Sequence, residues 1–109
     1  MVDASVEKSV KNYLKKLKEA GYGECYAVVY GSHATGSADS WSDIDILVVS
    51  PLFDREIKRG DINTLWRIAA ETDSRIEPVP VGKIQYASDD GNALIELARR
   101  GGHIVKPAA

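Results

Sequence analysis

The chain has 109 residues, of which 44% are hydrophobic and 28% are charged, values that are typical of a folded protein and that exclude wholesale disorder. This length leaves room for one modest core, so we expect a single domain over residues 1–109. The formal charge of −2 argues against a dedicated nucleic-acid-binding protein, which usually carries a basic excess. Because the sequence contains neither a signal-peptide pattern nor an apolar run long enough to span a membrane, we expect a cytoplasmic protein.

Apolar residues recur at helical spacing near the beginning of the sequence and predict an amphipathic helix over residues 4–20, with Asp3 as N-cap and Gly21 as stop. The opposite face of this helix carries lysines, which we interpret as solvated. Residues 25–30 form an apolar run that is rich in β-forming residues and predicts a buried strand. The one cysteine, Cys25, excludes an internal disulfide and is expected to be a buried, unreactive thiol.

Helices and strands alternate through the remainder of the sequence. Small residues over 31–42 predict a loop with one short helical turn from Ser32. Pro78 and Pro80 place the third predicted strand at a sheet edge or in a bulge. The alternation predicts an α/β (α+β) fold with one layered core, in which Trp66 is buried. The predicted elements after residue 42 are a strand over 43–49, an irregular segment over 51–60, a helix over 61–71 that Asp61 caps, a strand over 75–81, a polar connection over 82–91, a helix over 92–100 that Asn92 caps and a strand over 103–105.

Two aspartates, Asp43 and Asp45, open the second predicted strand. Side chains in a strand alternate between faces, so both carboxylates are expected on one face, with Cα atoms about 6.5–7 Å apart. Two like charges on a partly covered face repel each other and lose hydration, and a divalent cation compensates for both effects. Carboxylate oxygens are hard ligands that suit Mg²⁺ or Mn²⁺. The alternative is that both aspartates stand in water at the rim of an ordinary strand.

Gly31 and Ser32 end the first predicted strand, and a short loop then returns the chain to the two aspartates. The glycine and the acids are therefore expected at neighbouring strand ends. Glycine lets backbone N–H groups approach a phosphate closely, and the serine hydroxyl can donate to it. Taken alone, Gly31-Ser32 is compatible with a plain turn. Beside paired carboxylates, it favours phosphoryl or nucleotidyl transfer through bound metal ions.

The segment VVYGSHATGSADSWSDIDILVV resembles the signature of the DNA polymerase beta-type nucleotidyltransferase superfamily, and in particular that of the small minimal nucleotidyltransferases. This signature is an apolar strand, Gly-Ser, a second glycine, and Ser-Asp-x-Asp leading into another apolar strand. The resemblance implies the nucleotidyltransferase fold, a small mixed sheet flanked by helices. It is strongest over residues 24–50 and extends to 81, and ALIELARRGGHIVK resembles the family's helix-glycine-strand ending. The positions that match the signature are 31–32, 36, 42, 43 and 45.

A third carboxylate on a later strand, next to the first pair, is implied by this resemblance. The candidates are Glu71, Asp73 and Glu77. We favour Glu77, because it lies in the β-like run over 75–79, whereas Asp73 is expected in the turn before it. The family often has aspartate at this place, and the alternative for Glu77 is a solvated edge residue. His33 follows Gly-Ser where many relatives have arginine, and it either donates to a phosphate or is a surface loop histidine.

The resemblance also implies an activity, the metal-dependent transfer of a nucleoside monophosphate, with ATP as the expected donor, to a hydroxyl acceptor. Two Mg²⁺ ions, or Mn²⁺, are expected, one of them shared with the third carboxylate. Trp41, in the loop before the acids, either packs or stacks on a base. The metal-binding and catalytic residues that the resemblance implies are Asp43, Asp45 and Glu77, and the nucleotide-binding residues are Gly31, Ser32 and Ser42, the last of which either orients the acids or caps the loop.

Partners are a further implication of the resemblance. Larger relatives carry an additional helical domain that builds the base and acceptor pocket, and this sequence does not include one. Minimal nucleotidyltransferases are commonly paired with small helical HEPN proteins, which implies an antitoxin that adenylylates a tyrosine of its HEPN partner. Two other hypotheses stay open: a non-catalytic module that neutralises a partner by occlusion, and an enzyme that modifies a small molecule, as the antibiotic nucleotidyltransferases do. The oligomeric state is left open by the sequence.

Overall fold

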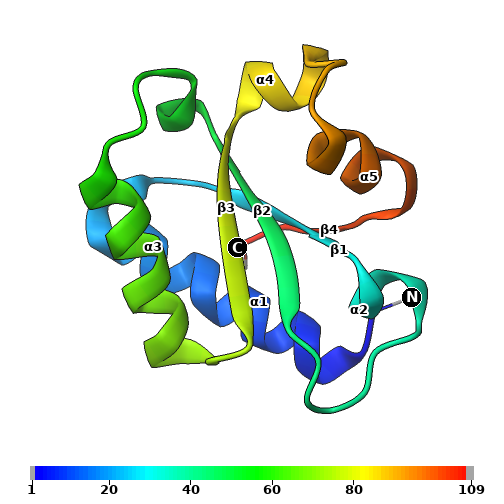
Figure 1. The fold of residues 1–109 in the computed structure, drawn as a ribbon. Coiled ribbons are helices and arrows are strands. Elements are labelled where there is room, and N and C mark those ends of the chain that lie inside the picture. The colour runs from blue at the N-terminus through cyan, green and yellow to red at the C-terminus, as the bar shows by residue number, and fades with distance from the viewer. Residues whose placement is uncertain (1, 108–109) are drawn as a thin grey trace.

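A four-stranded mixed sheet forms the centre of the computed structural model, which describes residues 2–107 (Figure 1). The strand order is β3-β2-β1-β4. Strand β1 (Tyr26–Tyr30) pairs antiparallel with both β2 (Ile44–Ser50) and β4 (His103–Val105), whereas β2 pairs parallel with β3 (Ile76–Gly82). The predicted mixed sheet is therefore confirmed, and the proline-containing strand β3 lies at its edge, where a missing backbone donor is tolerated.

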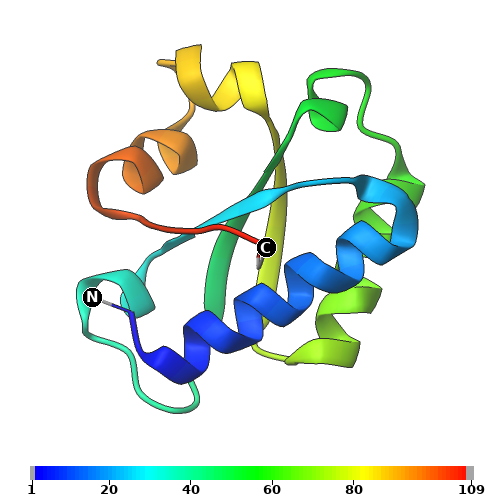
Figure 2. The same cartoon turned by 180° about the vertical axis from the view of Figure 1, so that it is seen from behind.

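Helices cover both faces of this sheet. Helices α1 and α3 pack on one face, and α1 crosses that face in the view of Figure 2. Helices α4 and α5 contribute side chains to a second apolar cluster on the other face. The helical elements are α1 (Ala4–Leu17), the π-helix η1 (Lys18–Tyr22), α2 (Ser32–Thr35), the 3-10 helix η2 (Pro51–Asp54), α3 (Arg59–Thr72), α4 (Lys83–Ser88) and α5 (Ala93–Gly101).

The first predicted helix is confirmed, with one change at its end. The side chain of Asp3 caps α1 by accepting a hydrogen bond from the backbone N–H of Ser5 at 2.7 Å. After Leu17 the helix continues as η1 and turns at Gly21, whose φ of 98° lies in the left-handed region that favours glycine. The apolar positions on which the prediction depends are all buried: Val6, Val10, Tyr13, Leu14 and Leu17.

Strand β2 divides its side chains between the two apolar clusters. Ile44 and Ile46 belong to the cluster beneath α1 and α3. Leu47 and Val49 belong to the cluster beneath α4 and α5. Because alternate residues share a face, Asp45 lies on the same face as Leu47 and Val49. The candidate acids are therefore on the side of the sheet that carries α4 and α5.

The helix predicted over 61–71 is confirmed as α3, but it begins earlier, so the prediction that Asp61 is its N-cap was wrong. Its N-cap is Lys58, and the carboxylate of Asp61 accepts a hydrogen bond from the Lys58 backbone N–H at 3.1 Å. The prediction that Trp66 is buried was wrong, because this side chain is 45% exposed. Leu65 and Ile68 fill the buried face of the helix instead.

Two short helices were missed by the sequence prediction. The segment expected to be irregular over 51–60 contains η2, and the polar connection expected over 82–91 contains α4. The carboxylate of Asp54, at the end of η2, accepts hydrogen bonds from the backbone N–H groups of Ile84 at 3.0 Å and Gln85 at 3.2 Å. The N-terminus of α4 is thus satisfied by a residue that is distant in the sequence.

The predicted cap of the last helix and the buried cysteine are confirmed. Asn92 caps α5 by accepting from the N–H groups of Leu94 and Ile95 at 2.9 and 3.1 Å. Cys25 is buried, and that burial raises the pKa of its thiol. Within residues 2–107, every helix is too short or too polar to cross a membrane.

Candidate active site

The turn after β1 brings the backbone next to the first candidate acid. The carbonyl of Gly31 accepts hydrogen bonds from the backbone N–H groups of Ala34 and Thr35, both at 3.1 Å, and thereby starts the short helix α2. The φ of Gly31 is +75°, and a Cβ atom placed on it would lie 2.8 Å from Oδ2 of Asp45. The hydroxyl of Ser32 makes no hydrogen bond to another described residue, whereas its backbone carbonyl accepts from the Thr35 hydroxyl at 3.3 Å.

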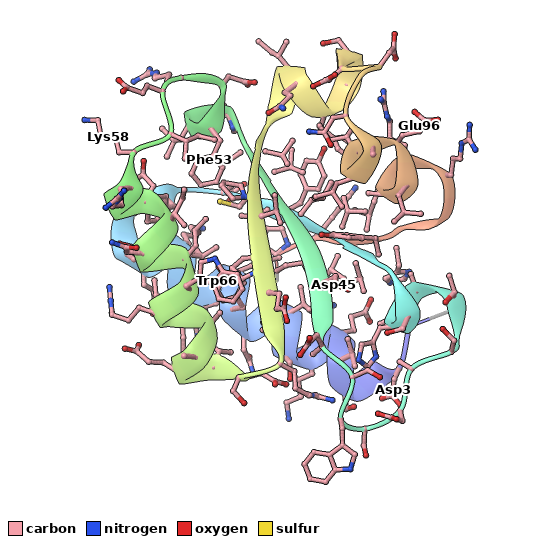
Figure 3. All side chains as sticks on the ribbon, viewed as in Figure 1. Asp3, Asp45, Phe53, Lys58, Trp66 and Glu96 are labelled. Atoms are coloured by element: carbon pink, nitrogen blue, oxygen red, sulfur yellow. The ribbon has the colours of Figure 1, made fainter. Side chains whose placement is uncertain are left out.

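Strand pairing places the second and third acids opposite each other. Asp45 lies between Tyr30 on β1 and Glu77 on β3 in the register of the sheet. In Figure 3, Asp45 lies at the end of β2 that is close to α2. Asp43 immediately precedes β2, and the next residue, Ile44, donates its backbone N–H to the carbonyl of Arg75 at 2.7 Å. This backbone hydrogen bond therefore joins the start of β2 to the segment that leads into β3, next to the acids.

The pKa values of two of the three carboxylates are shifted by the neighbouring acids. Burial, and next the charge of Asp43, raise the pKa of Asp45. The side-chain interaction with Asp43 is the main cause of the raised pKa of Glu77, followed by burial and by the charges of Asp43 and Asp45. Each shift means that the ionised form of the group is disfavoured in the folded chain. A positive charge placed among them would remove this penalty.

The donor chemistry of this group fits a divalent cation. All three side chains offer hard oxygen ligands, which Mg²⁺ and Mn²⁺ prefer. Among residues 2–107, no three His, Cys, Asp or Glu side chains are already gathered around one point as a formed metal site. Asp43 and Asp45 nevertheless both raise the pKa of Glu77, and Asp43 also raises that of Asp45. A divalent cation bound among these carboxylates would offset their mutual repulsion.

The other two candidates for the third carboxylate are engaged elsewhere. Asp73 binds Arg75 through two contacts, from Nε to Oδ1 at 3.1 Å and from Nη2 to Oδ2 at 2.8 Å. These hydrogen bonds lower the pKa of Asp73 to about 2. Glu71 is on the exposed side of α3 and contacts Arg67 at 3.4 Å. Of the three candidates, Glu77 alone is opposite Asp45 in the sheet.

Ser42 caps its own loop. Its hydroxyl donates to Oδ1 of Asp39 at 3.2 Å and accepts from the Asp39 backbone N–H at 3.1 Å. Of the two roles expected for this hydroxyl, the structure therefore has the capping one. Trp41, one residue earlier, is 88% exposed and does not pack on the protein.

His33 has a role that the sequence did not indicate. Its imidazole is 9% exposed, so of the two alternatives the surface loop histidine was wrong. Nε2 of His33 lies 3.0 Å from the carbonyl oxygen of Ser42, to which it donates. Residues that are nine positions apart make this contact, and no local pattern in the sequence indicates it.

The comparisons with known proteins bear on this arrangement at the level of the family. No curated protein matches the chain. The family model described as "Nucleotidyltransferase domain" matches residues 9–89, well over half of the chain, and this range includes the Gly-Ser turn and all three carboxylates. The matched region thus contains the mixed sheet's β1, β2 and β3. Membership of this family makes the chain a transferase domain with a nucleoside triphosphate as its substrate. We conclude that this chain belongs to the nucleotidyltransferase domain family.

Proposed function

We propose that this protein transfers a nucleoside monophosphate from a nucleoside triphosphate to a hydroxyl acceptor, in a reaction that needs Mg²⁺ or Mn²⁺. The observation that carries the proposal is the juxtaposition of Asp45 with Glu77 across two parallel strands, together with the raised pKa values of both groups, to which the neighbouring carboxylates contribute. Paired carboxylates of raised pKa in this arrangement have an energetic reason to bind cations.

Each residue has a defined task in this proposal. Asp43, Asp45 and Glu77 hold the cations, and Ser32 donates its free hydroxyl to a phosphate oxygen of the substrate. Gly31 lets the backbone approach the same phosphate, since a side chain there would meet Asp45. When bound, the cations stabilise the negative charge that develops on the pyrophosphate leaving group and lower the pKa of the attacking hydroxyl.

A transfer assay with α-labelled nucleoside triphosphates and Mg²⁺ tests this function. We expect label to reach an acceptor with the wild-type chain, and the Asp43→Asn and Glu77→Gln variants to lose this activity. The matched control is Glu71→Gln, which neutralises a carboxylate that contacts Arg67 on α3 and should leave the transfer unchanged. Equal transfer by wild type and Asp43→Asn would overturn the proposal.

The finer part of the proposal concerns the donor and the acceptor. We propose ATP as the donor and a tyrosine of a helical HEPN partner as the acceptor, in an antitoxin role; its support is the resemblance of the Gly-Ser and Asp-x-Asp segment to minimal nucleotidyltransferases. Mass spectrometry of the co-expressed partner should find AMP on a tyrosine. If partner binding persists without any adduct and is unchanged in Asp43→Ala, neutralisation by occlusion replaces this interpretation.

A further inference from the structure

The loop over residues 37–42 leads directly into Asp43 and is the most irregular part of the candidate site. It contains neither helix nor strand, and most of its side chains are exposed, including that of Trp41. Its backbone is nevertheless held on both sides of Trp41, because the carbonyl groups of Ser40 and Ser42 accept hydrogen bonds from side chains outside the loop. Two anchors on an otherwise exposed loop suggest that the position of this loop matters for the acidic residues next to it.

The first anchor is His33. It follows Gly31 and Ser32 directly in α2, and its buried ring reaches across to the Ser42 carbonyl at 3.0 Å. A carbonyl oxygen only accepts, so Nε2 of His33 carries the proton of this hydrogen bond. One side chain therefore links the turn proposed to bind phosphate to the residue immediately before Asp43.

The second anchor is Arg75. Its guanidinium is oriented by the two contacts with Asp73, and its remaining Nη1 donates to the Ser40 carbonyl at 3.3 Å. The backbone carbonyl of Arg75 accepts from Ile44, and Glu77 follows two residues later on β3. This anchor therefore links the loop to the strand that carries the third carboxylate.

We propose that His33 and Arg75 are positioning residues, which clamp the backbone over 40–42 and thereby hold Asp43 next to the other two carboxylates. The consequence for catalysis rests on the proposed function. The physical reason is preorganisation: a carboxylate that hangs from an irregular loop must be ordered before it can bind a cation, and the clamp supplies that order in advance. Supporting residues of this kind typically change metal affinity or activity by about 10- to 100-fold when they are removed.

The test compares two substitutions of one residue. His33→Gln keeps an N–H donor that can reach the Ser42 carbonyl, whereas His33→Leu removes the donor and keeps an apolar side chain. The matched control is His103→Leu, which removes the other histidine; His103 lies on β4, and its Nε2 contacts Glu7 of α1 at 3.0 Å. Affinity for Mn²⁺ in the presence of ATP is measured by electron paramagnetic resonance, and backbone order by amide hydrogen exchange over 39–43.

We expect His33→Leu to lose about tenfold or more in Mn²⁺ affinity and to exchange faster over 39–43, and His33→Gln to remain within about threefold of wild type. His103→Leu should change neither quantity. A purely structural role would weaken both variants of His33 in proportion to their lost stability. Unchanged Mn²⁺ affinity and exchange in His33→Leu, or an equal loss in His33→Gln, would overturn the clamp.

Two further outcomes remain decisive. If wild type itself fails to bind Mn²⁺ with ATP, the proposed function fails, and the exchange rates over 39–43 still decide whether the clamp exists. If His33→Leu does not fold, Arg75→Met replaces it, since this variant keeps the aliphatic part of the side chain and removes the hydrogen bond to Ser40. Faster exchange over 39–43 and weaker Mn²⁺ binding in Arg75→Met support the clamp, and wild-type values contradict it.

Discussion

The backbone of Gly31 lies against the carboxylate of Asp45, so closely that a Cβ atom at Gly31 would be 2.8 Å from Oδ2. The φ of Gly31, +75°, adds a second penalty for any side chain. We therefore predict that Gly31→Ala lowers the free energy of unfolding by about 1–3 kcal/mol and moves Asp45. Chemical denaturation measures the first effect, and Mg²⁺-dependent nucleotidyl transfer, expected to be strongly reduced, measures the second.

Gly36 provides the matched control for this prediction. Its φ is +82°, nearly the same as that of Gly31, but a Cβ atom there would have no neighbour within 4 Å. Gly36→Ala should therefore cost only the backbone strain of about 1 kcal/mol and leave transfer largely intact. Equal losses of activity in Gly31→Ala and Gly36→Ala would contradict a specific contact with Asp45.

Neutralising Asp45 should make the folded chain more stable while it removes the activity. The raised pKa values of Asp45 and Glu77 mean that their ionised forms destabilise the fold, so this penalty is largest near neutral pH and disappears as the pH falls through the raised values. Without divalent ions, Asp45→Asn should therefore melt at a higher temperature than wild type at neutral pH, and the difference should shrink in acid. Transfer should fall by about a hundredfold or more.

Mg²⁺ should reverse the order of these two proteins. A cation that binds only the folded state stabilises it by about 2.7 kcal/mol when its concentration is 100 times its dissociation constant. Wild type should gain this stabilisation and Asp45→Asn should not, as thermal scans with and without Mg²⁺ will report. A wild-type melting temperature that ignores Mg²⁺ and Mn²⁺ would argue against a metal site.

Much of this architecture was predictable because it depends on local patterns. Helical spacing, the Asn92 cap and the apolar runs predicted α1, α5 and the four strands, since periodicity and capping act within a few residues. Helix α4 escaped prediction because Asp54, about thirty residues earlier in the sequence, satisfies its first N–H groups. Trp66 was misplaced because the spacing of apolar residues does not show which of them lies at the margin of the buried face.

The distinction between local sequence patterns and contacts that are distant in the sequence also applies to the candidate site. Gly31, Asp43 and Asp45 were recognisable because their spacing within one strand-loop-strand unit matches a family signature. The β-like run over 75–79 already favoured Glu77 over Asp73, and the structure adds two observations that local sequence does not contain: the parallel register of β2 and β3 and the hydrogen bonds that hold Asp73 to Arg75. The assignment of Glu77 as a metal ligand stays a prediction that the variants above test.

The ion pair between Asp73 and Arg75 should make stability fall at low pH. The pKa of Asp73, about 2, is below its ordinary value of 3.8. The ion pair therefore contributes its full stability above pH 3.8 and loses it as the pH falls towards 2. The side chains are 15% and 28% exposed, and after allowance for screening we expect about 1–2 kcal/mol. Urea denaturation of wild type and Asp73→Asn across the acidic range measures this: the two curves should differ near neutral pH and converge in acid. A constant difference would contradict it.

Gly82 and Gly60 are predicted to respond to alanine in opposite directions. A Cβ atom at Gly82 would overlap Oδ1, Cγ and the backbone Cα of Asp54, the residue that caps α4, so Gly82→Ala must displace that cap. We expect a loss of about 2–4 kcal/mol in the free energy of unfolding, as for other overpacked sites that also lose a cap. Gly60 lies in the first turn of α3 with no atom within 4 Å of such a Cβ, so Gly60→Ala should gain up to about 1 kcal/mol from helix propensity. Urea denaturation of both variants should place their midpoints on opposite sides of wild type, and a stable Gly82→Ala would show that Asp54 is free to move away from α4.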